Sequence, residues 1–154
     1  MLVLTLIGFL FMVLLCKKQW FRKFLWGMLL LWAAAILYQT VLSRSPGPER
    51  PAFGFFFDTY RIVLHGGNPE VLRSAYMNVL LFFPMGMMVG GILGRESGRA
   101  CWKALGAMLL FSACIELIQY VFALGWGECD DIMHNLLGGG LGLLIGRCAV
   151  KCRK

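Results

Sequence analysis

The chain has 154 residues, 59% of them hydrophobic, with a mean hydropathy of +0.72 and a formal net charge of +7. This hydrophobic share exceeds the roughly 45 to 50% of an ordinary soluble domain, so we expect an integral membrane protein. Because the apolar residues come in blocks of helix-spanning length, without the alternation of a membrane β-barrel, the predicted class is all-α, with one membrane domain over residues 1–154.

Five apolar segments predict a bundle of five transmembrane helices. In chain order they cover residues 1–16, 24–42, 75–94, 101–124 and 135–150. We interpret the first as a retained span, because Lys17 and Lys18 follow its apolar run, whereas a cleaved signal peptide carries its positive charge before that run.

The longest connection, residues 43–74, interrupts this series of helices. Pro46, Pro48 and Pro51 disfavour a helix in its first part, and an aromatic cluster follows. The segment from Asp58 to Leu64 could form a short interfacial helix with its aromatic residues among the lipid headgroups. We favour an anchoring loop over a lid above a site, because aromatic belts usually have that role.

Basic residues are divided unevenly between the two sides of the membrane that five spans would create. One side, which includes the C-terminal tail, carries eleven Lys and Arg residues and a single acid, Glu96, whereas the other carries four arginines and six acids. The positive-inside rule therefore predicts an outer N-terminus and a cytoplasmic C-terminus. Orientation and an anionic inner leaflet explain the basic excess, so membrane lipids and no nucleic acid are the expected partners.

The fourth span carries a polar stripe in its outer half. Ser112, Glu116, Gln119 and Tyr120 follow i, i+4, i+7, i+8 spacing and share one helix face. An ionisable side chain at membrane depth costs about 2.5 to 3.5 kcal/mol on insertion scales, so it usually faces the interior of a bundle and marks a site.

The neighbouring spans carry matching polar residues. Asp131, Asn135, Gly138 and Gly142 repeat along one face of the fifth span, and Asn78 enters the third span near its outer start. We predict one outer-leaflet polar site, formed by Asn78, Glu116, Gln119, Asp130, Asp131 and Asn135.

Two residues beside this site have a simpler interpretation. Asp130 could serve only as the N-cap of the fifth helix, because carboxylates there accept unpaired backbone N–H groups. His134 is expected at the membrane interface rather than as a ligand. The predicted topology also leaves Cys129 as the one outer cysteine, so no outer disulfide within the chain is expected.

Small residues and one proline indicate how the spans pack. Two glycine series have the small-x-x-x-small spacing that lets helices approach closely in lipid: Gly86, Gly90 and Gly94, and Gly138, Gly142 and Gly146. Pro84 lies within the third span, where it frees the carbonyl of Leu80 and favours a kink. We therefore expect structural roles for Pro84, Gly86, Gly138 and Gly142.

Two motifs resemble those of VanZ-like membrane proteins. Residues Asn78–Gly86 match N-x-L-L-F-x-P-x-G, Ile115–Gln119 match I-E-x-x-Q, and Asp130–Gly138 match D-D-x-x-x-N-x-x-G. The resemblance extends over residues 77–146. Family members commonly carry an arginine before the acidic turn, which here reads Gly125–Glu128, so Arg61 or Arg73 from the long loop would have to substitute.

The resemblance implies a cell-envelope protein that lowers susceptibility to lipoglycopeptide antibiotics such as teicoplanin. Its outer-leaflet site would meet the lipid tail of the drug or a lipid-linked cell-wall intermediate.

The polar residues themselves leave two alternatives open. One is a membrane enzyme acting on a lipid or polyprenyl-linked headgroup, with Glu116 as acid or base and with Asp130 and Asp131 holding Mg²⁺ or another divalent cation. The candidate metal ligands are then Asp130, Asp131 and Glu116, although no Ser or Cys nucleophile with a nearby base accompanies them. The other is a purely structural role, in which polar side chains join the helices.

Overall fold

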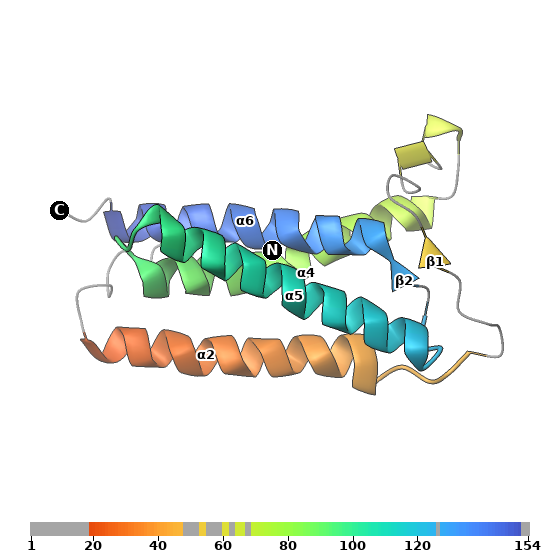
Figure 1. The fold of residues 1–154 in the computed structure, drawn as a ribbon, viewed down its shortest axis with the longest axis horizontal. Helices are drawn as coiled ribbons and strands as arrows, with labels where there is room; N and C mark the ends of the chain where they lie inside the picture. The colour runs from red at the N-terminus through yellow and green to blue at the C-terminus, as the bar shows by residue number, and fades with distance from the viewer. Residues whose placement is uncertain are drawn as a thin grey trace.

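The computed structural model describes residues 19–47, 53–54, 60–61, 64–66, 69–125 and 127–151. Four α-helices account for most of them: α2 (Gln19–Leu37), α4 (Pro69–Leu93), α5 (Gly98–Val121) and α6 (Cys129–Lys151) (Figure 1). A π-helix, η1 (Tyr38–Leu42), continues α2. The described chain is therefore all-helical in class, apart from two strands of two residues each, β1 (Phe53–Gly54) and β2 (Gly127–Glu128).

Three of the described helices are long and apolar enough to cross a membrane, over Trp20–Leu42, Val71–Leu93 and Gly98–Val121. They correspond to the predicted second, third and fourth spans. The predicted third span, residues 75–94, begins earlier in the structure because α4 starts at Pro69. Proline is tolerated there, in the first turn of a helix. The chain is thus a membrane protein with transmembrane helices.

Two parts of the predicted bundle remain predictions. The first span, residues 1–16, lies outside the described residues, and so does most of the predicted interfacial helix, of which Tyr60, Arg61 and Leu64 are described as helical. The fifth predicted span falls within α6, which has 23 residues but is not among the three spanning candidates. The mean hydropathy of α6 is lowered by its glycines and by the polar residues in its first two turns.

The helices run in alternating directions between the two ends of the molecule. In Figure 1, α2 and α5 run one way, whereas α4 and α6 run the other. Helix α6 packs along α4, α5 packs against α6, and α2 packs against α4. The parallel pair α4 and α6 makes the most extensive contact and forms the centre of the fold.

Glycines bring α4 and α6 into backbone contact. A Cβ atom added to Gly138 would overlap the carbonyl of Val79, and one added to Gly142 would overlap that of Phe83. From the other side, a Cβ atom at Gly86 would overlap the backbone of Gly139. The two glycine series that the sequence shows therefore lie in one helix contact, where any side chain would hold the backbones apart.

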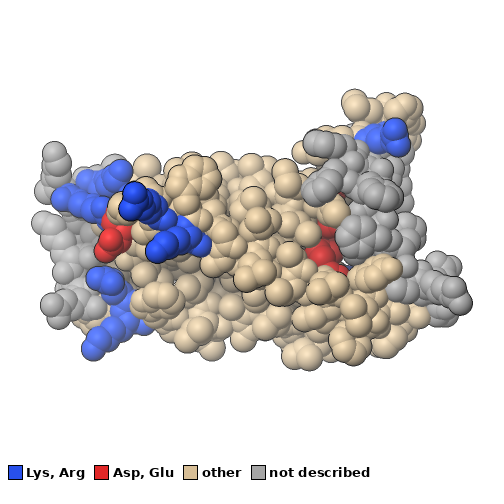
Figure 2. All heavy atoms as spheres, viewed as in Figure 1, with Lys and Arg blue, Asp and Glu red and all other residues tan. Residues whose placement is uncertain are grey.

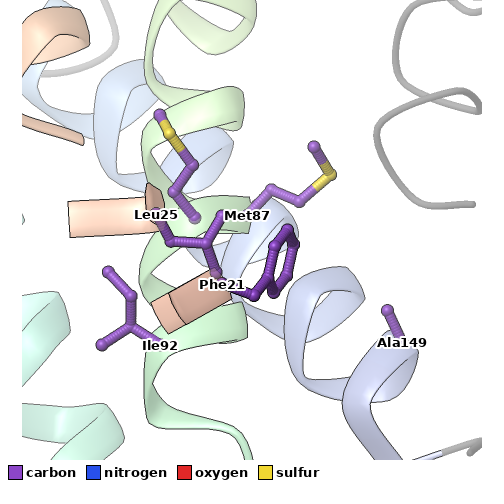
Figure 3. Close-up of a cluster of buried hydrophobic side chains, with 6 residues drawn as sticks. Phe21, Leu25, Met87, Ile92 and Ala149 are labelled. Carbon is purple, nitrogen blue, oxygen red and sulfur yellow. The ribbon is translucent and has the colours of Figure 1, made fainter. Parts of the chain in front are cut away.

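Apolar clusters and two polar links join α2 and α5 to this pair. Figure 3 shows Phe21 and Leu25 of α2 packed with residues of α4 and α6 (Figure 3). The indole Nε1 of Trp32 donates to the carbonyl oxygen of Leu81 at 2.9 Å. Leu81 lies three residues before Pro84, and α4 continues through this proline. At the far end, the guanidinium of Arg147 donates to the carbonyls of Gly94 and Glu96 and to Cys101 Sγ, which ties α6 to the turn between α4 and α5.

The opposite end is held by contacts that no local pattern predicts. Strand β1 pairs in parallel with β2, so that Phe53 lies opposite Gly127 and Gly54 opposite Glu128. The N–H of Gly47 donates to the carbonyl of Ala123 at 2.8 Å. Parts of the long connection are thereby fixed against the turn between α5 and α6.

Candidate functional site

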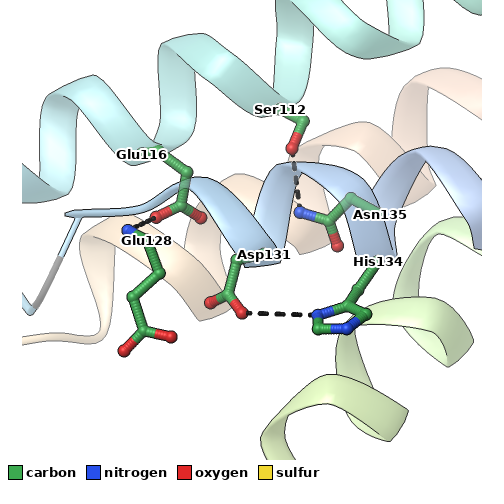
Figure 4. Close-up of polar contacts among 6 residues, drawn as sticks. All are labelled: Ser112, Glu116, Glu128, Asp131, His134 and Asn135. Atoms are coloured by element: carbon green, nitrogen blue, oxygen red, sulfur yellow. Dashed lines mark hydrogen bonds and ion pairs between the residues drawn. The ribbon is translucent and has the colours of Figure 1, made fainter. Parts of the chain in front are cut away.

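A buried hydrogen bond joins α5 to α6 near this end. Asn135 Nδ2 donates to Ser112 Oγ at 2.9 Å, and the two residues are 4% and 0% exposed, respectively (Figure 4). Ser112 lies on the polar stripe of α5, and Asn135 lies on the face of α6 that turns towards the other helices. A polar side chain placed so deeply between apolar helices needs such a partner.

Glu116 lies one helical turn beyond Ser112 and is also buried. Its Oε2 accepts a hydrogen bond from the backbone N–H of Glu128 at 3.2 Å, which links the stripe to strand β2. The charges of Asp131, Glu128 and Arg44 all act on the Glu116 carboxyl group. A carboxyl group is therefore enclosed among two other acids and one guanidinium, inside the contact between α5 and the start of α6.

His134 also belongs to this cluster, and its place relative to the membrane interface stays a prediction. The residue is 6% exposed, and its Nδ1 lies 3.9 Å from Asp131 Oδ1, which is too long for a hydrogen bond. The ring of Tyr60 lies over it at a centroid distance of 6.2 Å. Because His134 follows Asp131 by three residues and precedes Gly138 by four, helical geometry turns it towards the same packed face.

Within the part of the chain that the structure describes, three polar side-chain atoms around this end are buried without a hydrogen-bond partner. They are Asn135 Oδ1, His134 Nδ1 and Asn78 Nδ2. An unsatisfied buried polar group costs about 1 to 3 kcal/mol, and in native proteins it often marks the place of a water molecule, ion or ligand. The cluster therefore retains hydrogen-bonding capacity that the described residues do not use.

The six residues predicted as one site fall into separate surroundings. Glu116, Asp131 and Asn135 lie in the α5–α6 contact just described. Gln119 instead donates through Nε2 to the backbone carbonyl of Thr40 at 2.9 Å, joining α5 to η1. Asn78 lines a different cavity, between η1 and α4. Asp130 is buried in the first turn of α6, where the helix dipole favours a carboxylate.

Besides His134, two further members of the cluster are absent from the predicted site. One is Ser112, which lies on the polar stripe. Its position four residues before Glu116 could have predicted it as a member of the site. The other is Arg44, whose charge acts on the Glu116 carboxyl group. One of its Nη atoms would lie 2.8 Å from a Cβ atom at Gly125. The substitution by Arg61 or Arg73 stays a prediction. No local pattern could identify Arg44, because it lies far from the acidic turn in sequence.

A metal role for the carboxylates finds no support in this geometry. Within the described ranges, no group of three or more His, Cys, Asp or Glu residues is arranged to hold a metal ion. The candidates Asp130, Asp131 and Glu116 do not converge as a ligand set: Glu116 accepts from the backbone of Glu128, and Asp131 faces His134.

Comparison with known proteins adds a family to this geometry. A family model described as VanZ/LLP1 matches residues 25–150. The chain is also 32% identical over 73 residues to Protein VanZ of Enterococcus faecium, a match that covers 47% of this chain and 44% of that protein. No solved structure matches. The family match includes all four α-helices in whole or in part, together with every residue of the polar cluster.

Proposed function

The chain belongs to the VanZ/LLP1 family, and we propose that it is a cell-envelope protein that lowers susceptibility to lipoglycopeptide antibiotics such as teicoplanin. The observation that carries the proposal is the family match over the greater part of the chain. The buried polar cluster of α5 and α6 lies within the matched residues and is the place where we expect the protein to act.

The charge distribution supports an orientation with this cluster at the outer leaflet. Most of the Lys and Arg side chains visible in Figure 2 lie at the end where α6 finishes, while carboxylates are visible at the opposite end (Figure 2). Described basic residues of that first end are Arg22, Lys23, Arg95, Arg99, Lys103, Arg147 and Lys151. The positive-inside rule then assigns the basic end to the cytoplasm and the polar cluster to the outside.

The proposed mechanism is recognition at the outer leaflet. The ligand would be the drug itself, engaged near its lipid tail, or a lipid-linked cell-wall intermediate. Glu116, Asp131 and His134 would meet its polar part, since two of the three unpartnered polar atoms lie on His134 and Asn135 beside them. The apolar surfaces of the surrounding helices would accept its hydrocarbon part.

The experiment measures minimal inhibitory concentrations of teicoplanin and vancomycin in a susceptible Gram-positive host. The host expresses the wild type, Glu116→Gln or Asp131→Asn at matched membrane levels. We expect the wild type to raise the teicoplanin value at least about fourfold and both variants to lose most of that protection, because each replaces a carboxyl group of the cluster with an amide. The vancomycin value should change less, because vancomycin has no lipid tail.

A suitable control is Leu117→Ala, next to Glu116 on α5. Leu117 is 58% exposed on the helix surface, so it should keep the protection of the wild type. No protection by the wild type would contradict the proposed function. Protection that survives both carboxylate variants would keep the function but remove it from the cluster.

A further inference from the structure

A second polar cavity lies between η1 and α4 and shares Arg44 with the α5–α6 cluster. Its volume is about 420 Å³, and both sides contribute polar groups to its wall. From η1 and the residues after it come Gln39, Thr40, Ser43 and Arg44, and from α4 come Arg73, Ser74 and Asn78. Asn78 is the first residue of the N-x-L-L-F-x-P-x-G motif, and the α5–α6 cluster gives it no role.

The charge of this wall favours an anion. Arg44 and Arg73 contribute two guanidinium groups, and the described residues that line the cavity include no Asp or Glu. Asn78 Nδ2 adds a buried N–H donor that has no partner. The hydroxyl groups of Thr40 and Ser43 donate to the carbonyls of their own helix. The groups of the wall that are suited to an anion are therefore its two guanidinium groups and the Asn78 amide.

The order of residues along α4 adds an apolar end to the cavity. Arg73, Met77 and Leu81 follow at four-residue intervals and share one helix face, with about 12 Å of helix between the first and the last. Arg44 follows the end of η1, so both arginines lie towards the end of the molecule that carries the polar cluster. The cavity therefore has a cationic part towards this end of the molecule and an apolar part farther along α4.

A ligand that fits both parts has a negatively charged head and a hydrocarbon tail. We infer that this cavity binds the phosphate group of an amphiphile, with Arg44, Arg73 and Asn78 holding the phosphate and with Met77 and Leu81 contacting the start of the chain. Guanidinium groups pair well with phosphate oxygens because their N–H groups form a fork that matches two oxygens. The inference goes beyond the proposed function, since a headgroup site here does not depend on drug protection.

The experiment uses the full chain purified in a nonionic detergent, with binding measured by calorimetry. The probes are dihexanoyl phosphatidate, inorganic phosphate and zwitterionic dihexanoyl phosphatidylcholine. The variants are Arg44→Gln, Arg73→Gln and Asn78→Leu. Arg61→Gln is the matched control, because Arg61 is exposed at the same end but does not line the cavity.

We expect phosphatidate to bind the wild type and each cavity variant to weaken it about tenfold or more, as the loss of a hydrogen bond to a charged group predicts. Arg61→Gln should bind like the wild type, and phosphatidylcholine should bind more weakly. Inorganic phosphate that binds equally well, with the same dependence on the variants, would support the phosphate site but assign it to a soluble anion.

Equal binding of phosphatidate by the wild type and all cavity variants, or no binding by a wild type that melts as a folded protein, would overturn the inference. Thermal unfolding of each variant in the same detergent identifies any that fails to fold, and the two exposed arginines provide variants that should not disturb packing. A failed binding experiment would leave the antibiotic assay intact, because Glu116 and Asp131 do not line this cavity.

Discussion

Asn135 shows how a single residue of the cluster can join two helices and still keep a hydrogen-bond acceptor for a ligand. Its Nδ2 donates to Ser112, whereas its Oδ1 has no partner. A side chain used only to hold α5 against α6 would gain from having both ends paired. Asn135 Oδ1 and the neighbouring His134 Nδ1 make no hydrogen bond with the described residues. A structural role alone explains this feature of the cluster least well.

Ala123 is a second residue with an unusual conformation, at the point where α5 ends and the acidic turn begins. Its φ is 52°, in the left-handed region that glycine adopts easily and alanine does not. The N–H of Leu124 bonds to the carbonyl of Gln119 at 2.9 Å, which closes the helix end around Ala123.

Replacing Ala123 with glycine should therefore stabilise the fold. A left-handed non-glycine residue costs about 1 to 2 kcal/mol, and the greater freedom of glycine in the unfolded chain offsets part of this, which leaves a gain of about 0.5 to 1 kcal/mol. The measurement is the free energy of unfolding in mixed micelles. Ala107→Gly, within the same helix, should instead lose about 1 kcal/mol, and a loss in both variants would show that the strain at Ala123 is not relieved.

At the scale of elements, the parallel pair of α4 and α6 depends on glycines whose hydrogen atoms face a neighbouring backbone. Gly138, Gly142 and Gly146 meet the carbonyls of Val79, Phe83 and Met87 in turn. A backbone carbonyl cannot rotate away as a side chain can, so even one methyl group must separate the helices. The residues of the polar cluster on α6 lie next to this contact and depend on it for their position.

The substitution Gly138→Ala tests this contact against Gly140→Ala in the same helix. The added methyl group would overlap Val79 at position 138, but at position 140 it would meet only Leu105 Cδ2 at 3.8 Å, an ordinary contact. We expect a loss of about 2 kcal/mol in unfolding free energy for the first variant and a gain of up to about 1 kcal/mol for the second, because alanine favours a helix over glycine. Similar stability of the two variants would rule out this tight packing.

At the scale of the whole molecule, the two ends differ in charge and in how they are joined. One end carries most of the described basic residues and is tied together by Arg147. The other holds the polar cluster, the cationic cavity and the β1–β2 pair. The proposed orientation places the second end outside, and each end has a cysteine that can report on it: Cys148 near the basic end and Cys129 at the start of α6.

Labelling of single-cysteine variants in intact cells tests this orientation. With the other cysteines changed to serine, a membrane-impermeant maleimide should modify Cys129 from outside, whereas Cys148 should react only after the cells are opened. Labelling of Cys148 alone in intact cells would reverse the proposed topology.

The pH dependence of the same reaction probes the surroundings of Cys129. Burial, with the charges of Asp130 and Glu116, raises the pKa of the Cys129 thiol. Since the thiolate reacts and the thiol does not, modification at pH 7 should be slow and should accelerate about tenfold per pH unit until the pH reaches the raised pKa. A rate that is already constant at pH 7 would contradict a raised pKa of the Cys129 thiol.

The sequence by itself determined the membrane class, three apolar helices and the two glycine series that allow close helix packing, because each depends on local length, hydropathy or four-residue periodicity. It also placed Glu116 on the polar face of α5. Only the tertiary structure decided which faces meet: it buried His134, paired Gln119 with Thr40 across 79 residues and brought Arg44 to Glu116. It likewise separated Asn78 into its own cavity. These contacts join distant segments without any repeating pattern, so their partners are fixed by the packing of the helices and not by local sequence.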